Sequence, residues 1–175
     1  TKKYPSTKEL ASYLDENYGA RLSTNIATKG KSQTINVYSS FVNDVYLPIN
    51  ESLLVRQIQL LSDLFFNPLV QDQKFDEEIV KMKKKELKER LQVNKDDKFS
   101  YSLDKLFEYM GKNHTLGIPS TGYEDEIDTI SSHDLYKYFL ETIQNDEKHL
   151  YVVGDIDESI IDILNQHLQF PENNK

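Results

Sequence analysis

The sequence predicts an α+β domain in which helices cover one face of an antiparallel sheet. An amphipathic helical pattern opens the chain, and two segments with period-two alternation follow it. Helical patterns then fill most of the remaining chain. Because no helix separates the two strand-like segments, antiparallel pairing is favoured over a doubly wound parallel sheet.

Length and composition exclude several classes of protein. The chain has 175 residues, which fits one domain, and we expect that domain to cover residues 1–175. Its net charge of −8 argues against a nucleic-acid binder. The absence of cysteine excludes disulfides, thiolate zinc sites and cysteine nucleophiles. No apolar run reaches the roughly 20 residues that a membrane span needs.

A helix followed by a hairpin is predicted at the start of the chain. Ser6 and Glu9 have the spacing of a capping box, and Gly19 stands where a left-handed residue ends such a helix. The helix is expected to pack through Leu10, Leu14 and Tyr18. Alternation predicts strands over residues 22–26 and 35–39, and the segment TKGK between them predicts a tight antiparallel turn.

Three helical patterns follow the hairpin. The helix over residues 51–66 is apolar around much of its circumference, so we expect it to be buried, with Asn50 as its cap. Asp76 is predicted to cap a helix that includes residues 79–92 and exposes a lysine-rich face. After a break at residues 94–97, a third helix carries an apolar stripe made of Phe99, Leu103, Leu106, Phe107 and Met110.

The last part of the chain is expected to contain a loop, a helix, a strand and a final helix. Residues 111–128 hold three of the six glycines and a proline, which predicts the loop. Ser131 or Ser132 is expected to cap the next helix. Residues 149–153 predict a strand. The final helix is marked by Ile160, Ile161, Leu164 and Leu168.

The histidines do not have the spacing of a zinc helix. Two histidine ligands on one helix face must stand four residues apart, as in His-x-x-Glu-His. No pair has this spacing among His114, His133, His149 and His167. His114 lies in the expected loop, where functional residues concentrate, yet a structural role is favoured for it.

The charged clusters also favour structural roles. A lysine-rich run could form an anion site, and it consists of Lys81, Lys83, Lys84, Lys85, Lys88 and Arg90. It alternates with glutamates as a solvated helix face does, so the solvated face is the favoured interpretation. The acids Glu124, Asp125, Glu126 and Asp128 lack the spacing of a calcium loop. Asp155 and Asp157 fit a turn after a strand. The residues alone therefore assign no catalytic, cofactor-binding or metal-ligating residue.

Taken in order, the segments resemble the pitrilysin/insulinase-type zinc peptidases. The resemblance begins with YPSTKELASYLDENYGARLS and the Lys-Gly hairpin, and continues through FVNDVYLPINESLLVRQIQLLSDLFFNPLV. It extends over FDEEIVKMKKKELKERLQVNKDDKFSYSLDKLFEYM and NHTLGIPSTGYEDEIDTISSHDLYKYFLETI, and ends at LYVVGDID. The resemblance rests on the agreement of these segments in their order along the chain, and the bacterial cytoplasmic branch of the family is the most similar. It implies a metallopeptidase-like domain that is incomplete at its N-terminus.

The resemblance also implies where zinc ligands should stand. Family members hold zinc through a His-x-x-Glu-His helix, which lies N-terminal to the segment where this chain begins, and through a Glu on the helix that corresponds to residues 79–92. Ungapped placement puts this Glu position on Arg90 and an earlier acidic position on Lys83. Because a cation repels zinc, we expect no metal ligand and no zinc in this chain.

These departures predict a non-catalytic family member. It would help to bind peptide or unfolded protein in the cytoplasm and pair with an active homologous chain or half-domain, without nucleic acid or a membrane span. An alternative is a fragment of an active zinc-dependent endopeptidase in which Glu86 or Glu89 is the third ligand. A purely structural interaction domain is a second alternative. A chain that starts at Thr1 without Met is expected to be a piece of a larger protein and to expose an apolar face.

Overall fold

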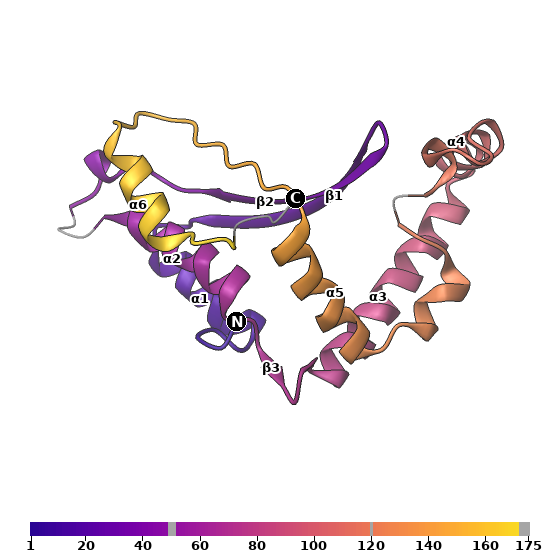
Figure 1. Cartoon of the computed structure of the whole chain (residues 1–175), viewed down its shortest axis with the longest axis horizontal. Helices are drawn as coiled ribbons and strands as arrows, with labels where there is room; N and C mark the ends of the chain where they lie inside the picture. The colour runs from indigo at the N-terminus through magenta and orange to yellow at the C-terminus, as the bar shows by residue number, and fades with distance from the viewer. Residues whose placement is uncertain (49–51, 120, 172–175) are drawn as a thin grey trace. The chain divides into compact units, whose positions relative to one another are not determined.

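The computed structural model describes residues 1–48, 52–119 and 121–171, and it is an α+β structure (Figure 1). The helices of more than one turn are α1 (Thr7–Glu16), α2 (Leu53–Phe66), α3 (Glu77–Asp96), α4 (Lys98–Met110), α5 (Ser132–Asn145) and α6 (Ser159–His167). Short 3₁₀ helices are η1 (Asp44–Tyr46), η2 (Thr115–Gly117) and η3 (Glu124–Thr129). The strands are β1 (Arg21–Lys29), β2 (Ser32–Ser40), β3 (Val70–Gln71) and β4 (Lys74–Phe75).

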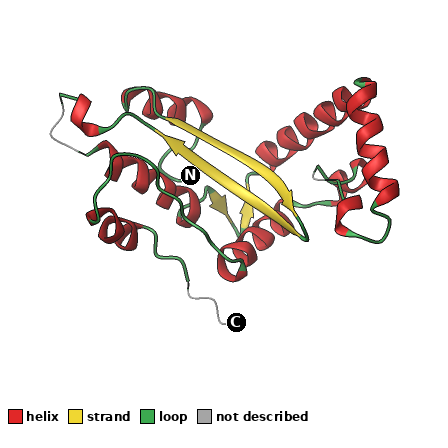
Figure 2. Ribbon diagram, turned by 90° about the horizontal axis from the view of Figure 1, so that it is seen from above, coloured by secondary structure: helices red, strands yellow, loops and turns green. Residues whose placement is uncertain are grey.

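The strands of the described residues form two separate two-stranded sheets, β1–β2 and β3–β4 (Figure 2). The chain divides into two units of dense internal contact. Unit 1 contains Thr1–Ser23, Tyr38–Asp72 and Lys137–Lys175, and unit 2 contains Thr24–Val37 and Gln73–Tyr136. The expectation of a single domain over residues 1–175 stays a prediction.

Helix α1 begins with the predicted capping box. The Ser6 hydroxyl accepts from the Glu9 amide at 3.2 Å, and the Glu9 carboxylate accepts from the Ser6 amide at 2.9 Å. The helix ends at Glu16 because the next residues leave helical geometry, and Tyr18 and Gly19 have φ of 57° and 69°. Gly19 is therefore the predicted left-handed residue, whereas the placement of Tyr18 on the helix stripe is wrong.

The β1–β2 hairpin confirms both predicted strands and extends them. Gly30, with φ of 61°, begins the two-residue turn, and this left-handed conformation is the reason that glycine suits the position. Two cross-strand side-chain bonds lie beside the turn. Thr34 donates to the Ala27 carbonyl at 3.1 Å, and the Asn36 amide donates to the Asn25 side-chain oxygen at 2.8 Å.

Helix α2 carries the core of unit 1. Leu53, Ile58 and Leu60 are buried on it, as the apolar pattern predicts. Its cap is Ser52, whose hydroxyl accepts from the Val55 amide, and the predicted cap Asn50 lies outside the described residues. The same core receives Ala20 from the end of the first turn and Ile160 from α6.

A buried amide joins α2 to the end of β2. Gln57 is fully buried, and its side-chain oxygen accepts from the Ser39 hydroxyl at 3.2 Å. Tyr13 of α1 donates to the Arg56 carbonyl at 3.3 Å, so polar contacts hold α1 and β2 against the same helix. A buried polar group needs such partners because its desolvation is costly.

In unit 2, α3 runs further than predicted. Asp76 caps it by accepting from the Ile79 amide at 2.9 Å, and the helix continues to Asp96 through most of the predicted break. Asp97 alone interrupts the helices, since its carboxylate accepts from the Phe99 and Ser100 amides and thereby starts α4.

The apolar stripe of α4 is not buried. Phe99 is 73% exposed and Met110 is 68% exposed, and the other stripe residues are also exposed. The predicted loop 111–128 is shorter than expected because η2 and η3 lie within it. Gly117 approaches the backbone of Gly111 so closely that a Cβ there would stand 2.6 Å from the Gly111 carbonyl oxygen.

The predicted strand over residues 149–153 is wrong. This segment runs between α5 and α6 without pairing to any strand in the described residues (Figure 1). Tyr151 and Val153 are 82% and 96% exposed. A β-prone sequence becomes a strand only where a neighbouring backbone supplies hydrogen bonds. In the part of the chain that the structure describes, none of the helices combines the length and the apolar character needed to cross a bilayer.

Replacing Leu60 by Ala should lower the free energy of unfolding by about 2–5 kcal/mol, because it leaves a cavity around a residue that is 1% exposed. Urea unfolding followed by circular dichroism measures the change. The matched control is Gln59→Ala on the exposed side of the same helix, with an expected change within about 0.5 kcal/mol. Equal losses for the two variants would contradict this assignment of the core.

Candidate functional site

An open groove of about 650 Å³ lies in unit 2, between one face of α3 and the segment that leads into α5. We call it the lysine groove. On the α3 side it is lined by Glu77, Val80, Lys81, Lys84, Lys85 and Lys88. On the other side it is lined by Asp128, Thr129, Ile130, Ser131 and Ser132.

Helical periodicity brings the four lysines of the groove together. Positions 81, 84, 85 and 88 are three, four and seven residues apart, so they share one face at about 100° per residue. Lys83 falls off this face and pairs with Glu86 at 2.7 Å instead. The lysine-rich run thus divides into a groove-lining row and a solvent-facing remainder.

Asp128 of η3 binds two lysines of the groove. Lys88 Nζ donates to Asp128 Oδ2 at 2.6 Å, and Lys84 Nζ donates to the Asp128 carbonyl oxygen at 3.2 Å. The hydrogen bond from Lys88, and its positive charge, hold the pKa of the Asp128 carboxyl below the ordinary value. Asp128 therefore remains ionised and fixes these two ammonium groups at one wall of the groove.

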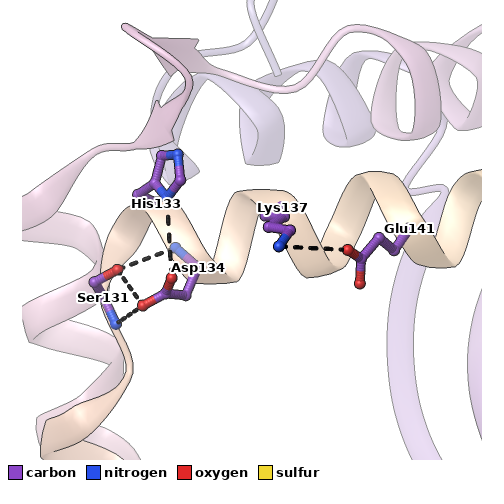
Figure 3. A network of polar contacts seen from close by, with 5 residues as sticks. All are labelled: Ser131, His133, Asp134, Lys137 and Glu141. Atoms are coloured by element: carbon purple, nitrogen blue, oxygen red, sulfur yellow. Dashed lines mark hydrogen bonds and ion pairs between the residues drawn. The ribbon is translucent and has the colours of Figure 1, made fainter.

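A capping network starts α5 beside this wall (Figure 3). The Ser131 hydroxyl accepts from the Asp134 amide at 3.0 Å and donates to the Asp134 carboxylate at 2.5 Å. The hydrogen bond that the Ser131 hydroxyl donates lowers the pKa of Asp134, and the one that it accepts identifies Ser131, of the two predicted candidates, as the cap. His133 Nδ1 stands 3.9 Å from Asp134 Oδ1, and one turn later Lys137 and Glu141 approach to 3.9 Å.

Two acids of η3 are partners of α3. Glu124 accepts a short hydrogen bond from Lys95, which raises the pKa of Lys95, and Asp128 binds Lys84 and Lys88. The interpretation of the lysine run as a purely solvated face is therefore only partly right. It holds for Lys83, whereas Lys85, which lies 3.7 Å from Glu89 on the same helix, also lines the groove.

The positions that bear on a metal site lie on the exposed surface of α3. Glu86 and Glu89 each form an ion pair with a lysine of their own helix, and Arg90 is exposed beside them. Within residues 1–48, 52–119 and 121–171, no three His, Cys, Asp or Glu side chains converge in a way that could hold a metal ion. The expectation that this chain contributes no metal ligand stays a prediction.

The histidines are not brought together. His114 accepts from the Leu116 amide at 3.3 Å and caps η2, which is a local structural role. His149 lies 3.3 Å from Glu147, and His167 stands in the last turn of α6.

The two aspartates after residue 153 act in the chain turn that precedes α6. The Asp157 carboxylate accepts from the Ser159 amide at 2.8 Å, and this bond holds its pKa below the ordinary value. The backbone carbonyl of Asp155 accepts from the Asn43 side chain at 3.2 Å. Both contacts support the turn that the sequence favoured for these residues, although no strand precedes it.

Sequence comparison finds a similar bacterial protein. Over 159 residues, which make up 91% of this chain, the sequence is 37% identical to the Bacillus subtilis (strain 168) protein named "Probable inactive metalloprotease YmfF". The matched region is 37% of that protein, so the chain spans little more than a third of its length. This similarity supports a metalloprotease-like family. No family model matches the sequence.

Structural comparison supports the fold. The chain matches a crystal structure of a conserved protein from Enterococcus faecalis V583 with a TM-score of 0.91 and 27% sequence identity. The match covers 99% of this chain and 41% of that one. The arrangement of helices and short sheets described above is thus shared with a segment of a longer bacterial protein.

Replacing Lys88 by Gln should raise the pKa of Asp128 towards its ordinary value of 3.8, because the lysine supplies the main hydrogen bond to that carboxylate. The folded-state pKa is lowered, so the stabilisation from this pair is present above the ordinary value and is lost as pH falls through the lowered pKa. Carboxyl NMR titration measures the shift. Lys83→Gln, which removes a lysine that pairs elsewhere, should leave Asp128 unchanged. An ordinary Asp128 pKa in the unmodified protein would refute the pair.

Proposed function

We propose that this chain is part of a non-catalytic homologue of the pitrilysin/insulinase-type zinc peptidases. It helps to bind peptide or unfolded-protein substrate and acts beside an active homologous chain or half-domain in the cytoplasm. The observation that carries the proposal is the 37% identity, across 91% of the chain, to a relative whose name describes an inactive metalloprotease.

Two residues of α3 give independent support. Arg90 stands where the resemblance places a zinc-ligating Glu, and Lys83 stands at an earlier acidic position of that helix. A guanidinium has no lone pair to give to a metal and remains charged at physiological pH. At about 100° per residue, Glu89 lies about 100° from Arg90 around the helix and Glu86 about 40° from it, and both carboxylates are already paired with lysines of the same helix.

The loss of zinc chemistry leaves the substrate-binding part of the function. Peptidases of this kind must hold an extended chain before they cleave it, and that step uses backbone hydrogen bonds and side-chain pockets rather than the metal. A homologue without zinc can therefore keep peptide affinity, which is the activity that we assign to the protein containing this chain.

The full-length protein, purified from zinc-supplemented culture, should contain well under one zinc per chain and cleave no peptide, because Arg90 and Lys83 oppose a cation on α3. Elemental analysis and a fluorogenic peptidase assay measure the two quantities.

The prediction of a zinc-free protein would be contradicted by one zinc per chain that is lost in Glu89→Gln or Glu86→Gln. The control is Glu78→Gln, which removes an exposed carboxylate from the first turn of the same helix and should leave metal content unchanged. Zinc that depends on Glu86 or Glu89 but not on Glu78 would identify an active zinc-dependent endopeptidase.

A further inference from the structure

We propose that the lysine groove binds acidic side chains of an extended peptide, so that the protein selects substrates rich in Asp and Glu. This inference rests on the proposed peptide-binding function and names the class of substrate. Nothing in it requires a metal or a catalytic residue.

The first argument is local charge. Four lysines line the groove against two carboxylates, those of Glu77 and Asp128, while the whole chain has a net charge of −8. On a chain of net negative charge, a locally positive groove attracts anions that the chain as a whole repels, and this gives orientation as well as affinity.

The second argument is spacing. The groove lysines stand at intervals of about one helical turn, roughly 5–6 Å between neighbouring Cβ atoms, along about 10 Å of α3. In an extended peptide, side chains on the same face recur about every 6.6–6.8 Å. Acidic residues at alternate positions therefore meet successive lysines, whereas a single oxyanion reaches only one or two of them.

The third argument is which lysines are available. Lys81 forms no ion pair among the described residues, and Lys85 approaches Glu89 only to 3.7 Å. Lys84 and Lys88 already bind Asp128: Lys88 holds the carboxylate through Oδ2, and Lys84 binds the backbone carbonyl oxygen. An incoming acidic residue can be held by Lys81 and Lys85.

The groove also has room and apolar surface for a peptide. Its volume of about 650 Å³ lies within the range of about 300–1,000 Å³ typical of ligand sites. Val80 and Ile130 line it between the charged groups, and Ile130 is 43% exposed. These apolar side chains can contact the peptide between its acidic residues. A nucleic-acid backbone would not use such contacts.

The test is fluorescence anisotropy with the full-length protein and two labelled ten-residue peptides. One peptide has Glu at alternate positions, and the other has Gln at the same positions. The Glu peptide should bind more tightly, and added salt should reduce the difference. The double variant Lys81→Gln/Lys85→Gln should weaken binding of the Glu peptide roughly three- to tenfold and leave the Gln peptide unchanged.

Two further variants separate the groove from charge and folding effects. Lys8→Gln/Lys112→Gln removes two exposed lysines outside the groove and should bind both peptides as the unmodified protein does. Lys81→Arg/Lys85→Arg keeps the charges and should retain the preference for the Glu peptide. Thermal unfolding of each variant checks that the fold is unchanged.

Three results would overturn the inference. Equal binding of the two peptides, or an equal loss of affinity in the groove and control variants, would rule out the groove as the binding site. The proposed peptide-binding function would remain. Tighter binding of a single-stranded oligonucleotide, lost in the groove variant, would replace peptide by nucleic acid. Failure to bind either peptide would refute both the groove and the proposed function.

Discussion

The contact between α3 and η3 is the interaction on which unit 2 depends. Ile127, which is 3% exposed, is the buried hydrophobic residue of η3, and in the described part of unit 2 it is the one aliphatic side chain with so little exposure. Lysines of α3 bind carboxylates of η3 on either side of it, through Lys88–Asp128 and Lys95–Glu124. Exposed ion pairs contribute little singly, so Ile127 supplies the apolar anchor and the lysines fix the register. Because η3 leads directly into the capped start of α5, the lysine groove exists only while this contact holds.

Local signals in the sequence were sufficient for most helices and for the main hairpin. Capping boxes and caps act over three residues, so Ser6 with Glu9, and Asp76 ahead of α3, could be identified without knowledge of the rest of the fold. The Gly30 turn is equally local. The β3–β4 hairpin gave no comparable signal, because its turn places Asp72 and Gln73, rather than glycines, at φ of 51° and 58°. Local chemistry predicts an element only where the residue types match the geometry.

The failures concern residues whose state depends on a distant partner. Residues 149–153 have the composition of a strand, but strand formation needs a second backbone, and the described chain offers none there. The stripe of α4 has helical spacing and is nevertheless exposed, because spacing predicts which residues share a face and not whether another element covers it. The chain spans only 37% and 41% of the two longer proteins that it resembles. The exposure of this stripe agrees with the expectation that the chain presents an apolar face.

At the candidate site, too, the local sequence pattern does not reveal which distant residues the charged side chains contact. A lysine run interleaved with glutamates has one sequence pattern whether its lysines face solvent or line a groove, since both arrangements use i,i+3 and i,i+4 neighbours. What separates them is η3, about 40 residues further along, where Asp128 binds Lys84 and Lys88. Lys83 and Arg90, on which the proposed absence of a metal site rests, lie off the groove-lining row, so the two features of α3 are independent. Under the proposed function, α3 holds no metal on one face and keeps, on another, the charges needed to hold an acidic peptide.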